Sequence, residues 1–143
     1  MIYRIATSGD INDVFNIETQ CFLTPWTTNL IASELEKPDY VAFAAVDNGK
    51  VCGYVFASCV LSEGEIERIA VTENMRRKGI GDELMRLAIE KLALSGVEKV
   101  FLEVRSDNYK AINLYKKHGF LTVGTRKKYY ENTKDALIMN LKL

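Results

Sequence analysis

A basic run with two glycines carries the strongest chemical signal in this 143-residue chain: Arg76-Arg77-Lys78-Gly79-Ile80-Gly81-Asp82. The run follows a stretch with the pattern of a strand and precedes residues with helical spacing. Glycines at the start of a helix expose backbone N–H groups, and the helix dipole favours an anion at that end. Three adjacent cations add to the same field. The run therefore predicts a phosphate or pyrophosphate site, and the alternative is a basic loop at a flexible helix entry.

Neither of the common nucleotide motifs fits this run. In a Walker loop a Lys and a Ser or Thr would follow in sequence, but Asp82 follows Gly81. Leu84 replaces the third glycine of a dinucleotide fingerprint, and a two-halved Rossmann sheet does not fit 143 residues with this many hairpins. We therefore expect a pyrophosphate-containing cofactor that docks in another way.

A second group of residues combines a carboxylate with a phenol. Glu103 falls near the carboxyl end of an expected strand, where ligands bind in open α/β sheets. Asn108, Ile112 and Tyr115 follow at helical spacing and share one face of the next helix. Glu103 and Tyr115 could therefore border one cleft. The alternative is a surface glutamate and a packed tyrosine.

Metal chemistry and covalent catalysis find little support in the sequence. The cysteines, Cys21, Cys52 and Cys59, are odd in number and form no Cys-x-x-Cys pair, which argues against a disulfide framework and a zinc site. A Cys59 nucleophile would need an activating base, but His118, the single histidine, stands at an expected helix end. We expect no metal and no covalent enzyme intermediate.

Two charged runs have both a plain and a functional interpretation. Glu63, Glu65 and Glu67 alternate, so an extended backbone would place them on one face. That face is either solvated or attractive to a substrate ammonium or a basic tail. Arg126-Lys127-Lys128 is expected to be a solvated sheet edge that discourages strand addition.

Composition indicates one globular domain, which we expect to span residues 1–143. Apolar residues make up 48% of the chain and charged residues 27%. The formal net charge of 0 argues against general nucleic-acid or membrane-surface binding. The longest apolar stretch, Tyr54 to Leu61, is too short to span a membrane, and the first residues lack the apolar core of a signal peptide. We expect a cytoplasmic protein, and the sequence leaves the oligomeric state open.

Periodicity predicts the elements that must position these residues. The expected strands cover residues 2–5, 40–46, 51–61, 65–71, 97–104, 120–130 and 136–143. The expected helices start after Asp10, at Thr27, at Ile80 and at about Asn108. Antiparallel hairpins then flank a central β-α-β crossover, so we predict a mixed α/β fold with helices packed on a mixed sheet.

In the two segments above, the chain resembles a known family. Arg76-x-x-Gly79-x-Gly81 resembles the acetyl-CoA signature of the GNAT N-acetyltransferases, in which Arg or Gln begins the motif and Gly or Ala ends it. Nearly the whole chain is similar, in order, to the RimI branch, the ribosomal-protein-alanine N-acetyltransferases. The further marks of that branch are Cys21-Phe22, Pro25-Trp26, Ile69-Ala70-Val71, Leu102-Glu103-Val104-Arg105, Asn108, Ala111-Ile112, Leu114-Tyr115, Gly119-Phe120, Tyr129-Tyr130 and Asp135-Ala136.

The resemblance implies the GNAT fold, a twisted, mostly antiparallel mixed sheet of about seven strands with about four helices, and acetyl-CoA as cosubstrate. It implies that Glu103 is the proton acceptor and Tyr115 the proton donor. The side chains of Trp26, Tyr129 and Tyr130 resemble walls of a peptide site. The implied cofactor-binding residues are Ile69, Ala70, Val71, Arg76, Arg77, Lys78, Gly79, Ile80, Gly81, Asp82 and Asn108.

The resemblance also implies direct acetyl transfer to the N-terminal amine of a protein, foremost the alanine of a small-subunit ribosomal protein. Two alternatives share the cofactor motif: an acetyltransferase for a small-molecule amine or an internal lysine, and a non-catalytic acyl-CoA-binding regulatory module. Three residues near the expected peptide site depart from the branch: Arg68 stands where Asn is frequent, Thr27 replaces Ser, and Glu131 replaces Pro. Whether Glu103 acts directly or through a water stays open.

Overall fold

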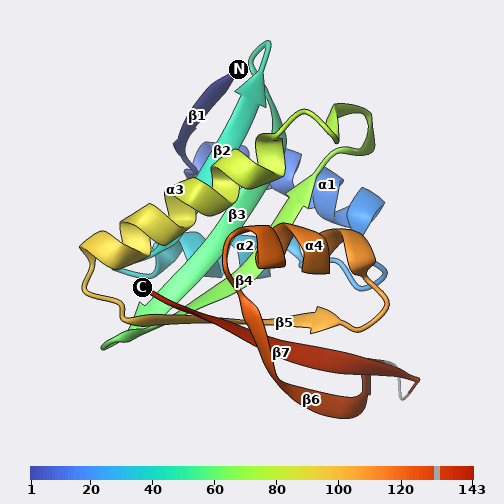
Figure 1. The fold of residues 1–143 in the computed structure, drawn as a ribbon. Helices are drawn as coiled ribbons and strands as arrows, with labels where there is room; N and C mark the ends of the chain where they lie inside the picture. Colours follow the sequence, from blue (N-terminus) through green and yellow to red (C-terminus); the bar gives the residue numbers. More distant parts are fainter. Residues whose placement is uncertain (131–132) are drawn as a thin grey trace.

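Seven strands form one mixed sheet in the part of the chain that the structure describes, residues 1–130 and 133–143. The strands are β1 (Ile2–Ile5), β2 (Val41–Asp47), β3 (Lys50–Val60), β4 (Glu63–Val71), β5 (Lys99–Arg105), β6 (Leu121–Tyr130) and β7 (Lys134–Lys142). In this computed structural model their order is β1-β2-β3-β4-β5-β7-β6 (Figure 1). Residues 131 and 132 and the side chain of Tyr130 lie outside the description. The mixed α/β fold that the sequence predicted is confirmed.

Four α-helices, again counted in the described residues, cover the two faces of the sheet. They are α1 (Ile11–Cys21), α2 (Thr28–Glu36), α3 (Ile80–Leu94) and α4 (Tyr109–Lys117). Thr27 and Asn108 cap the starts of α2 and α4, because their side-chain oxygens accept from Leu30 N at 3.1 Å and from Ala111 N at 3.2 Å. Both helix starts agree with the sequence-based expectation to within one residue.

The connections follow the predicted crossover, but the order of the last strands was not predicted. Strands β1 to β4 pair antiparallel in sequence, and α3 then links β4 to β5, which run parallel. Strand β7 lies between β5 and β6 and pairs antiparallel with both. Hydrophobic periodicity marks a strand without naming its neighbours, so sequence analysis left this order undetermined.

The pairing of β4 with β5 stops after three residue pairs. It runs from Glu63–Lys99 to Glu65–Phe101 among the described residues. In β4 an extra residue follows, since Ile66 and Arg68 pair with consecutive residues of β3 and leave Glu67 as a bulge. Beyond the bulge β4 stays paired with β3 to Val71, whereas β5 stays paired with β7. The carboxyl ends of β4 and β5 therefore diverge (Figure 1).

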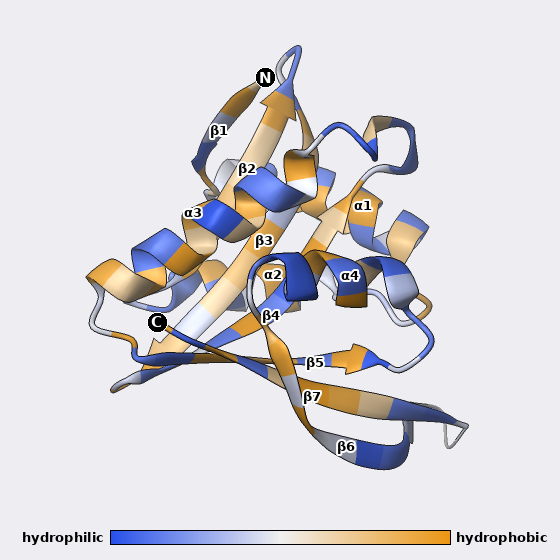
Figure 2. Cartoon of the chain, viewed as in Figure 1, coloured by the Kyte–Doolittle hydropathy of each residue, from blue (hydrophilic) through white to orange (hydrophobic). Residues whose placement is uncertain are grey.

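Each face of the sheet has its own apolar core. Residues of α3 and α4 pack with one face of β5, in a cluster that includes Leu84, Leu92, Leu102 and Tyr115. The other cluster joins α1 and α2 to the opposite face, through residues such as Val14, Ile17, Ile31, Tyr54 and Phe56. Figure 2 shows the central strand β3 as largely hydrophobic, whereas α3 alternates hydrophobic and hydrophilic residues along its length. The sheet thus separates two sides that can carry different chemistry.

Asp10 precedes α1 as expected, but its carboxylate does not cap that helix. It accepts from Thr7 N at 2.8 Å and forms two 2.8 Å hydrogen bonds with the Arg4 guanidinium of β1. The Arg4 hydrogen bond lowers the pKa of the Asp10 carboxyl. Asp10 is thus the N-cap residue of α1 by position, and its carboxylate is engaged by the Arg4 guanidinium and Thr7 N instead of by the N–H groups of that helix.

We predict that Gly53→Ala destabilises the protein because α3 presses directly on this glycine. A Cβ at Gly53 would lie 3.2 Å from Ala70 O, 3.2 Å from Ile80 Cγ2 and 3.3 Å from Leu84 Cδ1. Overpacking of this kind costs about 1–3 kcal/mol. Thermal melting measures the loss. Gly81→Ala is the control, because its Cβ meets only Leu114 Cδ2 at 3.5 Å; equal losses in both variants would contradict the prediction.

Candidate active site

The loop before α3 has the geometry of an anion site. Arg77 and Gly79 both have left-handed φ angles, 64° and 80°. The first hydrogen bond of the helix runs from Glu83 N to Gly79 O at 3.1 Å, so the N–H groups before Glu83 have no carbonyl within the helix. A Cβ at Gly79 would meet no atom of the described residues within 4 Å, so its φ angle rather than space favours glycine there. The N–H groups at the start of the helix and the helix dipole can together bind a diphosphate.

The three cations of the loop have different environments. The Arg76 side chain turns back to β4, where its Nε donates to Val71 O at 3.0 Å and its Nη2 lies 3.3 Å from Cys21 Sγ. Arg76 therefore fixes the loop on the end of the strand. Arg77 and Lys78 are exposed, and they supply the positive charge nearest the start of α3.

Asp82 carries its side chain away from the loop, toward α4. Its carboxylate accepts from Lys117 Nζ at 3.0 Å and lies 3.2 Å from His118 Nε2. The Lys117 hydrogen bond is the main cause that lowers the pKa of Asp82. Asp82 thus ties the start of α3 to the end of α4, and its carboxylate is engaged there rather than in the loop. His118 ends α4, as the sequence predicted.

Glu103 and Tyr115 lie on opposite faces of β5 rather than side by side. Leu102 and Val104 point into the core beneath α3 and α4, and the intervening Glu103 points to the other face. Tyr115 is 7% exposed and belongs to that core. Glu103 stands two residues beyond the last β4–β5 pair. The two groups therefore approach the diverging strands from different sides, which the sequence did not predict.

An arginine on β6 accompanies Glu103. Arg126 Nη1 lies 3.5 Å from Glu103 Oε1, and the Glu103 side chain is 31% exposed. The same guanidinium lies over the ring of Tyr129, 4.9 Å from its centroid. Arg126 was expected to lie on a solvated edge, because its partners are distant in sequence. Tyr129 is exposed, and the expected role of the Tyr130 side chain lies outside the described residues.

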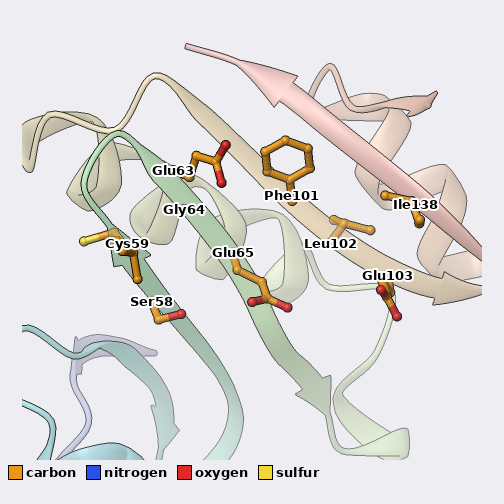
Figure 3. Close-up of a pocket in the computed structure, with 10 residues that line it drawn as sticks. Ser58, Cys59, Glu63, Gly64, Glu65, Phe101, Leu102, Glu103 and Ile138 are labelled. Carbon is orange, nitrogen blue, oxygen red and sulfur yellow. The ribbon is translucent and has the colours of Figure 1, made fainter. Parts of the chain in front are cut away.

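The face that bears Glu103 is hollowed and acidic. A hollow of about 300 Å³ is lined by residues of β3, β4, β5 and β7, with Glu63, Glu65 and Glu103 around it and Phe101 and Ile138 as apolar walls (Figure 3). Burial, followed by the charge of Glu103, raises the pKa of Glu65. Two of the three alternating glutamates therefore border a recess that can attract a cation, and the third, Glu67, occupies the bulge.

A buried charge network, which sequence analysis missed, lies near this face. Glu18 of α1 is fully buried and accepts from Tyr54 Oη, from Trp26 N at 2.7 Å and from Arg68 Nη2 at 2.8 Å. Burial and the Glu18 charge raise the pKa of Tyr54, which stays protonated and donates. The ring of Trp26 packs edge-on against Phe56, 5.5 Å between centroids. The predicted peptide-wall residue Trp26 is therefore half-buried and anchored.

The remaining predicted cofactor residues lie along β4 and at the start of α4. Ile69 and Val71 are half-buried against the α3 core, and Ala70 packs on the α1 side. Asn108 is exposed, with its side chain engaged in capping α4. In residues 1–130 and 133–143 no group of three or more His, Cys, Asp or Glu side chains could hold a metal ion. None of the described helices is long and apolar enough to cross a bilayer.

This fold and site belong to an acyl-transfer family. The sequence model of the Acetyltransferase (GNAT) family matches residues 11–120, so the chain is a member of that family. It is an N-acetyltransferase that uses acetyl-CoA, as the resemblance predicted.

Its relatives indicate the branch. The ribosomal protein bS18-alanine N-acetyltransferase of Escherichia coli K12 is 34% identical over 135 residues, 92% of this chain and 90% of its own. A Bacillus subtilis relative, to which the same activity is provisionally assigned, is 36% identical over 132 residues, 91% of this chain and 87% of its own. The crystal structure of the Escherichia coli enzyme matches with a TM-score of 0.91 and 31% identity, covering 99% of this chain and 92% of that one. The resemblance to the RimI branch is confirmed.

We predict that Glu67→Gln stabilises the protein at neutral pH. Burial raises the pKa of Glu67, and the neighbouring Glu34 acts in the same direction, whereas a hydrogen bond from Ser58 opposes them. A carboxyl with a raised pKa in the folded state favours folding when protonated and loses that contribution as pH rises through the folded pKa. The gain of the Gln variant should be up to about 1 kcal/mol at pH 7.5 and vanish near pH 4, below the unfolded pKa.

Urea midpoints at both pH values measure this difference. Glu63→Gln is the matched control, because Glu63 is exposed on the same strand. A Glu67→Gln variant that is less stable than the parent at pH 7.5 would show that the Ser58 hydrogen bond outweighs burial.

Proposed function

We propose that this protein acetylates the N-terminal α-amino group of another protein, with a small-subunit ribosomal protein that begins with alanine as the leading acceptor. The divergence of β4 and β5 is the observation that carries the proposal. Among the described residues it leaves β4 beyond Glu65 without a partner on the side of β5, and Glu103 stands just past that point on the acidic face. The similarity to bS18-alanine acetyltransferases over 92% of the chain supports the acceptor.

The cofactor side supports acetyl-CoA bound along β4 and the start of α3. An unpaired strand edge can hydrogen-bond an extended ligand that carries amides, as the pantetheine arm does. We assign Ile69, Ala70 and Val71 to that edge. The backbone of residues 76–82 would hold the pyrophosphate, with Arg77 and Lys78 as counter-charges, and Asn108 would contact the cofactor farther along. When bound, acetyl-CoA supplies the activated acetyl group.

An N-terminal amine is the easier acceptor on chemical grounds. With a pKa near 8, about a tenth of an α-amino group is neutral at pH 7, at a cost of roughly 1.4 kcal/mol. A lysine amine with a pKa near 10.4 would cost about 4.6 kcal/mol. The acidic recess beside Glu103 favours an incoming ammonium, and Glu103 would accept its proton directly or through a water.

On the face of the sheet that α3 and α4 cover, we assign Tyr115 as the proton donor. It would protonate the sulfur of coenzyme A as the C–S bond of the thioester breaks. Tyr115 lies on the core face of α4, and this burial keeps bulk water away from that step. Trp26, Tyr129 and Tyr130 are proposed as walls of the acceptor site. Residues 1–143 act as one catalytic domain in this proposal, and a ribosomal acceptor implies action in the cytoplasm.

Isotope-labelled acetyl-CoA with matched peptides tests the proposal. A peptide that begins with alanine and carries a basic ribosomal sequence should become labelled at its N-terminus. The same peptide with a blocked N-terminus and one internal lysine should not. Label only on the lysine or on small amines would support the alternative acceptor, and tight coenzyme A binding without turnover would support a regulatory module.

We predict that Glu103→Gln lowers the rate at pH 7 by about 100-fold, the usual contribution of a general base. The loss should shrink as pH rises toward 9, because a neutral amine no longer needs the carboxylate. A pH–rate profile of kcat/KM measures the effect. Glu98→Gln, on the exposed residue just before β5, is the control. An undiminished rate at pH 7 would remove Glu103 from the mechanism.

Tyr115→Phe should slow turnover by about tenfold or more while leaving coenzyme A affinity nearly unchanged, since a proton donor acts in the transition state. Steady-state kinetics and calorimetry with coenzyme A separate the two. Tyr109→Phe is the control, because Tyr109 lies on the same helix and is 71% exposed. A large loss of affinity with normal turnover would exclude the proton-donor role.

A further inference from the structure

We propose that Arg68 is the positioning residue of the acceptor site: paired with buried Glu18, it holds the segment between α1 and α2, residues 22–27, against the sheet. We call these residues the α1–α2 segment. The proposal rests on the proposed acetyl transfer, because the segment contains Trp26. It adds a residue that determines acceptor affinity: its backbone directly precedes the cofactor edge of β4, whereas its side chain contacts the α1–α2 segment.

The bulge at Glu67 decides which face Arg68 occupies. Ile66, before the bulge, packs in the core of α3, whereas Ala70 packs in the core of α1 and α2. Strict alternation would have placed both on one face, so the extra residue reverses the pattern. As a result Arg68 points to the α1–α2 side, one residue before the expected pantetheine edge.

The guanidinium of Arg68 fixes the segment at several points. Its Nη2 donates to Glu18 Oε1 at 2.8 Å and to Thr24 O at 3.1 Å, and its Nε lies 3.1 Å from Glu18 Oε2. It also lies over the ring of Phe22, 3.6 Å from the centroid, and 5.3 Å from that of Trp26. Glu18 in turn accepts from Trp26 N at 2.7 Å. Two backbone groups and two aromatic rings of one segment therefore depend on this ion pair.

The ion pair between Glu18 and Arg68 depends on both charges and on the planar guanidinium of arginine. The Glu18 side chain is 0% exposed and that of Arg68 is 20% exposed, so loss of the cation would leave a buried carboxylate poorly compensated. Lysine keeps the charge but lacks the planar fork that bonds Glu18 and Thr24 together and stacks on a ring. The asparagine frequent at this position in the RimI branch has neither charge nor fork.

Arg68→Lys and Arg68→Gln test the proposal with two independent readouts. Trp26 is the only tryptophan of the sequence, so its fluorescence reports the position of the segment without turnover. We expect acrylamide to quench Trp26 more efficiently in both variants. KM for the acceptor peptide should rise by about tenfold or more, whereas KM for acetyl-CoA and the affinity for coenzyme A should change by less than about twofold. The Arg68→Lys variant should show nearly the same rise in acceptor KM as Arg68→Gln, although it keeps the positive charge.

Arg4→Lys is the matched control. Arg4, on strand β1, also forms two short hydrogen bonds with one carboxylate, that of Asp10. This substitution should reduce stability without changing Trp26 quenching or the acceptor KM. An unchanged acceptor KM in the Arg68 variants, or a parallel loss of coenzyme A affinity, would overturn the proposal, as would full rescue by lysine. If the enzyme labels a small amine instead of peptides, the proposed function fails, and the same kinetics with that amine decide the role of Arg68.

Discussion

The parting of β4 from β5 is the constraint on which the rest of the structure depends. Two parallel strands share three residue pairs and then separate, each keeping its other neighbour. Unpaired strand edges are normally covered or blunted, so an edge left open inside a sheet is expected to serve a ligand. The bulge at Glu67 accompanies this separation, and it also turns Arg68 toward the α1–α2 segment. One extra residue in β4 thus links the proposed cofactor edge with the proposed acceptor side.

The net charge of the chain is zero, but the charged side chains near the proposed site are distributed unequally between the two sides of the sheet. Arg77 and Lys78 stand at the start of α3, whereas Glu63, Glu65 and Glu103 surround the hollow on the other face. An anionic cofactor and a cationic amine are each drawn to the opposite sign. The sheet lies between the two groups of charges. This division agrees with a reaction in which both substrates are present together.

Much of the cofactor side could be predicted because its signals are local. The loop before α3 needs left-handed backbone at Gly79, and the helix that follows shows its period in Leu84, Ala88 and Leu92. The acceptor side could not be predicted in the same way. Glu18 and Arg68 are fifty residues apart and carry no shared pattern. The direction of the Asp82 side chain depends on the end of α4, which its own neighbours in sequence do not specify.

By itself the sequence determined the elements, the crossover and the family, and it predicted a place for the diphosphate, because each depends on spacing within a few turns or on an ordered set of motifs. Only the tertiary structure decided that β7 lies between β5 and β6, that Glu103 and Tyr115 approach from opposite faces, and that a buried ion pair anchors Trp26. These features arise where distant segments meet. Their energies come from burial, strand pairing and charge compensation, which no local pattern encodes.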